Sequence, residues 1–186
     1  MSELYAPPFG LTYWLCLLLL MAARGLDFLS TWVATPSLLL EANPVARAMG
    51  WRLGVALNVL LCLVAAAIPY VAVLVSVTSV MVAARNFQGA WVMRTMGEYE
   101  YREHLREQFR RSDPRLVLGC VWAQAVLYAG VGAALVVLTG ELFSAAVGWG
   151  IVGFGPAIGV HSTNAYRKAR HVLSDEERVS QPSQSR

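Results

Sequence analysis

The chain has 186 residues, of which 56% are hydrophobic and only 15% are charged. Soluble globular domains carry about 25% charged residues, so this composition excludes an ordinary soluble protein and indicates a membrane protein. The net charge is +3, yet the arginines form no stripe interleaved with aromatic residues, which argues against a nucleic-acid-binding protein. The three cysteines lie inside apolar runs without the spacing of a zinc site, and we expect them to be packing residues.

The first apolar segment, about residues 11–34, predicts a membrane span, because about 20 apolar residues cross the hydrocarbon core as a helix. Pro36 should end this helix. The connector TPSLLLEANP follows, and Thr35 and Asn43 each precede a proline at a position suited to cap a new helical turn. The sequence therefore predicts a tight connector before the second span.

The second span is predicted within 44–67. Its start has two alternatives, because a glycine and an arginine interrupt the apolar pattern near residue 51. Either one helix runs from Pro44, or a short surface helix at 44–49 precedes a span that begins at Trp51.

The third span, about 69–94, is followed by the only long charged segment between spans. Apolar side chains recur there at four-residue spacing, which predicts an amphipathic helix over 97–112 that lies at the membrane surface. Two pairs with the acid placed four residues before the base should support it: Glu98–Arg102 and Glu107–Arg111.

The last two spans are predicted at about 116–138 and 142–163. Gly155 and Gly159 form a G-x-x-x-G pattern, which lets helices approach closely. This face either packs against other spans of the same chain or forms a homo-oligomer. Residues 165–186 are too polar to bury a core and predict a cytoplasmic, disordered tail.

Basic residues flank the spans on one side only. The segments 1–10, 67–69 and 139–141 contain no lysine or arginine, whereas the other connecting segments carry several. By the positive-inside rule, this distribution places the N-terminus outside and the C-terminus in the cytoplasm. The predicted fold class is therefore an all-α, multi-pass protein of the cell membrane, with five transmembrane helices and a helical membrane domain over 1–164.

Polar residues are concentrated near the inner end of the first span. Arg24, Asp27 and Thr31 fall within about 60° of one helix face, at i, i+3 and i+7. A charge at the centre of a bilayer helix costs about 2.5–3.5 kcal/mol, so such residues face the bundle interior, pair with one another or mark a functional site. One alternative is structural: an Arg24–Asp27 ion pair pins the helices together, and Thr31 bonds to its own backbone.

The other alternative is a polar cavity open to the cytoplasm. More polar residues are expected at the same leaflet, so the predicted ligand-binding set is Arg24, Asp27, Thr31, Glu41, Asn43, Asn58 and Asn86. Oxygen ligands from Asp27 and Glu41 suit a hard divalent cation such as Mg²⁺ or Mn²⁺. The same two carboxylates equally suit an acid/base pair or a proton relay. For Asn43, capping of the second helix is a competing role.

No catalytic motif decides whether the chain is an enzyme, since H-E-x-x-H, G-x-S-x-G and the P-loop pattern are absent. The segments LDFLSTW and EANP, however, resemble the D-x-x-[ST]-T … E-x-N-P signature of an uncharacterised prokaryotic integral membrane family, known as a domain of unknown function. The resemblance covers about residues 10–95. It implies no activity, but it implies that Asp27, Thr31, Glu41 and the Asn43-Pro44 pair form one unit.

Two functions follow as hypotheses. In the first, the chain is a multi-pass membrane protein whose cytoplasm-facing polar site binds a divalent cation or a small polar ligand. In the second, it is a structural or assembly partner whose polar cluster only locks helix packing. Transport by a single chain is disfavoured, because it needs a polar path to the outer leaflet and the second, fourth and fifth spans offer little beyond Gln124 and Glu141. The expected partner is the lipid bilayer, and a second copy of the chain is the alternative to intramolecular packing at Gly155 and Gly159.

Overall fold

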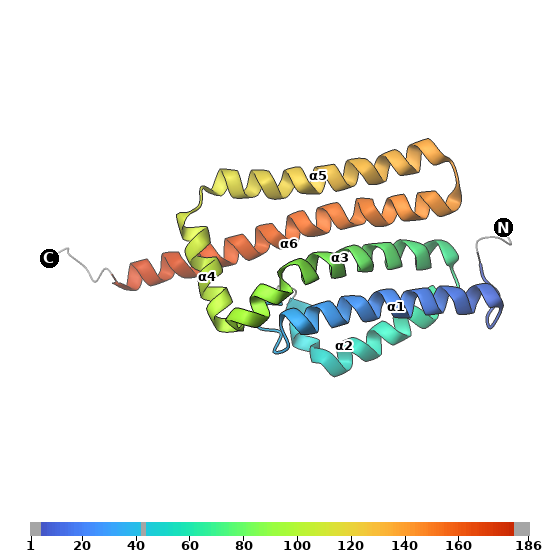
Figure 1. Cartoon of the computed structure of the whole chain (residues 1–186), viewed down its shortest axis with the longest axis horizontal. Coiled ribbons are helices and arrows are strands. Elements are labelled where there is room, and N and C mark those ends of the chain that lie inside the picture. Colours follow the sequence, from blue (N-terminus) through green and yellow to red (C-terminus); the bar gives the residue numbers. More distant parts are fainter. Residues whose placement is uncertain (1–4, 42–43, 181–186) are drawn as a thin grey trace.

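The structure, a computed structural model, describes residues 5–41 and 44–180. This part of the chain is built from helices (Figure 1), which are α1 (Leu11–Ala34), α2 (Pro44–Ala65), α3 (Pro69–Met96), α4 (Glu98–Arg111), α5 (Pro114–Thr139) and α6 (Leu142–Ser180). Five of them, all except α4, are long and apolar enough to cross a membrane. The prediction of an all-α fold with five candidate membrane spans is confirmed.

Prolines and glycines set the helix boundaries. Pro69 occupies the first turn of α3, where its missing N–H is not needed. Gly97 ends α3 with φ 86°, and Gly140 ends α5 with φ 65°, conformations that favour glycine. The side chain of Asp113 caps α5 by accepting a hydrogen bond of 2.8 Å from the backbone N–H of Arg115.

Helix α2 is divided at Gly50, whose backbone leaves the helical region with φ 65° and ψ −175°. A short helix at 44–49 therefore precedes the long segment that begins at Trp51. Of the two alternatives for the second span, the structure has the short helix followed by the longer one.

The C-terminal prediction is wrong in part. Helix α6 continues to Ser180, where the sequence predicted a disordered tail from residue 165. The segment 167–178, RKARHVLSDEER, is polar, but its arginine, lysine, alanine, leucine and glutamate residues favour a helix. The preceding turns of α6 supply the helix nucleus, so each further residue extends an existing helix. The remaining predicted tail, 181–186, lies outside the described residues.

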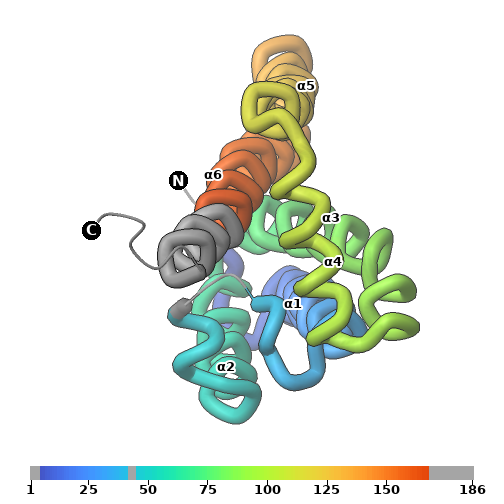
Figure 2. Tube along the Cα trace, turned by 90° about the vertical axis from the view of Figure 1, so that its left-hand side faces the viewer, coloured from blue at the N-terminus to red at the C-terminus, as the bar shows by residue number. Residues whose placement is uncertain are grey.

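The five long helices run side by side, and α4 lies across one end of the bundle (Figure 1). We call this the α4 end. Figure 2, which looks along the helices, shows α1, α2 and α3 grouped together and α5 projecting away beyond α6. Helix α3 packs closely against α1 and also contacts α6, while α2 packs against its neighbours less closely.

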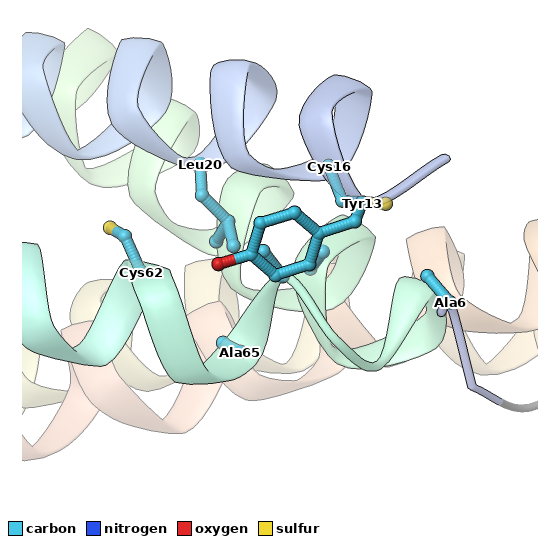
Figure 3. Packing of buried hydrophobic residues seen from close by; sticks show 8 residues of the cluster. Ala6, Tyr13, Cys16, Leu20, Cys62 and Ala65 are labelled. Carbon is cyan, nitrogen blue, oxygen red and sulfur yellow. The ribbon is translucent and has the colours of Figure 1, made fainter. Parts of the chain in front are cut away.

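The main apolar core lies at the end opposite α4, and Figure 3 shows how its residues pack. It is built mostly from small side chains, which let the backbones approach closely: Ala6, Tyr13, Cys16, Leu20, Cys62, Ala65, Ala66 and Ala72. The hydroxyl of Tyr13 donates to the carbonyl of Leu63 at 3.1 Å, so its polar atom is satisfied. Cys16 and Cys62 are free and buried here, as expected for packing residues.

Glycines fix α6 between α5 and α3. A Cβ atom on Gly155 would lie 2.5 Å from the carbonyl oxygen of Ala125, and one on Gly159 would lie 3.1 Å from the ring of Trp122. The G-x-x-x-G face is therefore covered by α5 of the same chain, which is the intramolecular alternative, and it offers no surface to a second copy. On the other side, the hydroxyl of Thr78 on α3 donates to the carbonyl of Gly150 at 2.9 Å.

Candidate functional site

Arg24 joins three helices near the middle of the bundle. Its Nη1 atom donates to Asp27 Oδ2 at 2.7 Å on α1 and to Ser79 Oγ at 3.2 Å on α3. Its Nε atom donates to Asn58 Oδ1 on α2 at 2.8 Å, and Nη2 donates to the same oxygen. The guanidinium also lies over the ring of Phe28, 5.8 Å from the ring centre. The side chains of Arg24 and Asp27 are 25% and 16% exposed, so most of this network is withdrawn from solvent.

A second set of hydrogen bonds lies one turn further along α1. The hydroxyls of Ser30 and Thr31 donate to the carbonyl of Asp27, at 2.8 Å and 3.0 Å. Asn86 on α3 donates through Nδ2 to the same two hydroxyls, at 3.2 Å and 3.4 Å. Thr31 thus bonds to its own helix and also accepts a bond from α3, so the contacts expected for a helix lock are present.

The connector between α1 and α2 is fixed by the start of α4. Glu98 Oε2 accepts a hydrogen bond of 2.8 Å from the Thr35 hydroxyl and one from the Ser37 hydroxyl. The backbone N–H groups of Ser37 and Leu39 donate to Oε1 and Oε2, at 3.0 Å and 3.3 Å. Thr35 also acts as a cap, since its Oγ1 accepts from the backbone N–H of Leu40 at 3.1 Å. We call these Glu98 contacts the Glu98 latch.

The latch corrects one expected ion pair. The Glu98–Arg102 pair is not formed, because the Glu98 carboxylate turns to the four donors of the connector. Arg102 instead lies 4.0 Å from Glu103 and over the ring of Tyr99. The other expected pair is confirmed, with 2.6 Å between Glu107 and Arg111.

Two side chains from α2 fasten the other half of the connector. Arg47 Nη2 donates to the carbonyl of Glu41 at 2.7 Å, and Trp51 Nε1 donates to the carbonyl of Pro36 at 2.9 Å. The kink at Gly50 separates these two residues, so the short first turn of α2 and its long second part both hold the connector.

A cavity of about 420 Å³ lies between these elements, toward the α4 end. Its walls come from α1, from the connector between α1 and α2, and from α2, α3 and α6. The polar and charged residues that line it are Arg24, Asp27, Thr31, Glu41, Asn58, Asn86 and His161. Six of the seven residues in the predicted set therefore meet at one cavity. The seventh, Asn43, lies outside the described residues.

Several site residues were not in the predicted set. Ser30 and Ser79 are almost completely buried and contribute hydrogen bonds to the cluster. His161 lines the cavity from α6. The sequence assigned Glu98 only to an ion pair with Arg102, and no sequence signal linked it to the connector.

The two carboxylates predicted to bind a metal ion, Asp27 and Glu41, both line the cavity. Among the described residues there is no group of three or more histidine, cysteine or acidic side chains arranged to hold a metal ion. Asp27 Oδ2 is already bound to Arg24. Mg²⁺ and Ca²⁺ take six or more oxygen ligands, so a bound cation would need amide oxygens, water or ligand atoms besides these two side chains.

The chain matches no protein-family model, no curated protein and no solved structure.

Proposed function

We propose that the chain is a multi-pass membrane protein that binds a small polar ligand in the cavity lined by Arg24, Asp27, Glu41 and Asn86. The observation that carries this proposal is the convergence of the polar residues from four helices and the connector on one cavity of about 420 Å³. A cavity of a few hundred cubic ångströms with a few converging polar groups has the dimensions of a small-molecule site.

A helix lock alone accounts for only part of the cluster. Arg24, Asn58 and Ser79 tie α1 to α2 and α3, as a lock requires. Glu41, from the connector, and His161, from α6, line the same cavity. A cavity beside the network does not stabilise the packing of the helices, because unfilled space between helices loses van der Waals contacts.

The cavity lies near the end of the bundle that carries the arginines, and the positive-inside rule makes this end cytoplasmic. We therefore propose that the ligand enters from the cytoplasm. In a cysteine-free background, Glu100→Cys on α4 should react with a membrane-impermeant maleimide only after cells are permeabilised. Glu141→Cys, at the opposite end, should react in intact cells. Labelling of Glu100→Cys in intact cells would reverse the orientation.

The binding proposal is tested by thermal shift of the purified chain in detergent, with Mg²⁺, Mn²⁺ and glycerophosphoethanolamine as separate probes. The last is a small zwitterionic compound whose amine suits the acidic side of the cavity. Stabilisation by at least one probe in the wild type, and its loss in Glu41→Gln, is the expected result. Glu141→Gln, an exposed acid at the other end of the bundle, is the matched control and should keep the shift.

The structural alternative expects a different outcome. If the cluster only locks the helices, Glu41→Gln and Asp27→Asn lower the folded yield, and no probe changes the midpoint of thermal unfolding in any variant. That result would refute the binding proposal. Stabilisation by a divalent cation alone would favour the metal site of Asp27 and Glu41 over an organic ligand.

A further inference from the structure

A second, smaller cavity adjoins the first between α1 and α2. It has a volume of about 140 Å³, and its lining is mainly apolar: Met21, Arg24, Gly25, Phe28, Val55, Asn58, Val59 and Cys62. Arg24, Phe28 and Asn58 line both cavities. The hydrogen-bonded pair of Arg24 and Asn58 thus forms the boundary between the two cavities. We call the smaller, apolar cavity the α1–α2 groove.

The groove lies on the lipid-facing side of the bundle. Met21, Val55 and Val59 are exposed side chains of helices that are apolar enough to cross a membrane, whereas Cys62 is buried at its base. Gly25 helps to keep the groove open, because a Cβ atom at this position would meet no atom within 4 Å. The looser packing of α2 against α1 leaves this space between the two helices.

The charges around the two cavities are ordered along one direction. The polar cavity is lined by two acidic side chains, Asp27 and Glu41, and by Arg24 and His161. The two carboxylates outnumber the one permanently charged cation, Arg24, so the cavity complements a ligand with a cationic group. Arg24 stands where the two cavities meet. Four of its five N–H donors are used by protein acceptors, which leaves one for an anionic oxygen at this junction.

We propose that the ligand of the polar cavity is an amphiphile, a phospholipid with an ammonium headgroup, whose hydrocarbon chain lies in the α1–α2 groove. The ammonium faces Glu41 and Asp27, the phosphate lies beside Arg24, and the chain follows the apolar wall toward the bilayer. This order of cation, phosphate and chain matches the order of acids, arginine and apolar side chains. The inference rests on the proposed function, because it names the ligand class of that same cavity.

The test compares two probes that share a headgroup: lysophosphatidylethanolamine, which has an acyl chain, and glycerophosphoethanolamine, which has none. Binding to the full chain is measured by native mass spectrometry from a mild detergent. The wild type should bind the acylated probe at least tenfold more tightly. Gly25→Leu fills the groove and should reduce this ratio to about one, while binding of glycerophosphoethanolamine stays unchanged, which also shows that the variant folds.

Gly153→Leu on α6 is the matched control, since a Cβ atom there also meets no atom within 4 Å and the change is the same. It should keep the wild-type ratio. Val55→Phe narrows the groove from α2 and serves as a second groove-filling variant. Retention of the wild-type ratio in both groove variants would overturn the inference.

The remaining outcomes separate the two proposals. Equal binding of both probes to the wild type overturns the amphiphile inference and leaves the polar site standing. Binding of neither probe overturns the inference and counts against the polar site as well. Equally tight binding of lysophosphatidylglycerol, which has no ammonium group, would overturn the assignment of the headgroup.

Discussion

The Glu98 latch leads to a prediction about the connector. Two amide N–H groups and two hydroxyls of the segment 35–39 donate to this one carboxylate. Replacing Glu98 by alanine removes all four acceptor contacts at once. The helices that the connector joins do not depend on these bonds, so the expected effect is local opening rather than unfolding of the bundle.

The size of the effect follows from the kind of bond that is lost. A hydrogen bond to a charged group contributes about 1.5–3 kcal/mol. The site is partly exposed and water replaces much of what is lost, so we assign about 1.5–3 kcal/mol to the whole set rather than to each bond. Since about 1.4 kcal/mol corresponds to a factor of ten in an equilibrium constant, opening of the connector should become roughly 10- to 150-fold more frequent.

Hydrogen exchange of the peptide covering 35–41 measures this opening, because the amides of Ser37 and Leu39 are protected by Glu98 itself. Glu100→Ala is the matched control: it removes the same charge from the same first turn of α4, two residues away. Exchange in Glu100→Ala should equal that of the wild type. If Glu98→Ala exchanges no faster than Glu100→Ala, the latch contributes nothing in solution and the reasoning fails.

The latch should also depend on pH. Burial tends to raise the pKa of Glu98, but the hydrogen bonds from Ser37, Thr35 and Leu39 outweigh it and hold the pKa below its usual value of 4.5. A carboxyl group whose folded pKa is depressed stabilises the folded form above its unfolded pKa, and this contribution is lost as the pH falls through the folded pKa. Connector opening should therefore rise below about pH 4.5 in the wild type and stay constant with pH in Glu98→Ala.

Two further predictions concern the bundle itself. Arg24→Leu leaves Asp27 without its partner and should lower the free energy of unfolding by about 3 kcal/mol, whereas the double variant with Asp27→Leu should recover most of this loss. Denaturation in mixed detergent measures the stability of both variants. A double variant as unstable as the single one would contradict an ion pair at this site. A Cβ atom at Gly132 would lie 2.5 Å from the carbonyl oxygen of Gly148, so Gly132→Leu should force α5 away from α6 and lower the unfolding free energy by about 3 kcal/mol. Gly130→Leu, where a Cβ atom meets nothing within 4 Å, should have little effect on the same measurement.

The cavity could be anticipated from the sequence because charged groups within membrane spans are expensive. Arg24 and Asp27 have the spacing of one helix face, and few arrangements satisfy both in an apolar bundle. Helical periodicity therefore predicted their direction, and prolines predicted where the connector begins. The polar residues of α2 and α3 could be assigned to the same site because consecutive spans run in opposite directions. The end of α1, the start of α2 and the end of α3 therefore lie at one end of the bundle (Figure 1).

The remaining contacts could not be predicted, because they depend on the rotation of each helix. Ser79 looks like any small residue of a span, and its bond to Arg24 exists only because α3 presents that face to α1. Glu98 had a plausible partner four residues away in its own helix. The connector offered more donors, and no pattern in the sequence measures that competition. The same holds for Gly155 and Gly159, whose spacing permits close packing but does not say against which helix.

The lock and the cavity share Arg24 and Asn58, and the cavity adds Glu41 from the connector. Hydrogen bonds fix Arg24, Asn58 and Ser79 between three spans, while Glu41 belongs to a connector that the Glu98 latch holds in place. A ligand that contacts Glu41 must therefore bind the latched connector more tightly than the open one. Coupling of this kind is reciprocal, so lysophosphatidylethanolamine should slow exchange of the 35–41 amides, and Glu98→Ala should weaken its binding. A ligand that binds wild type and Glu98→Ala equally well would show that the connector takes no part in the site.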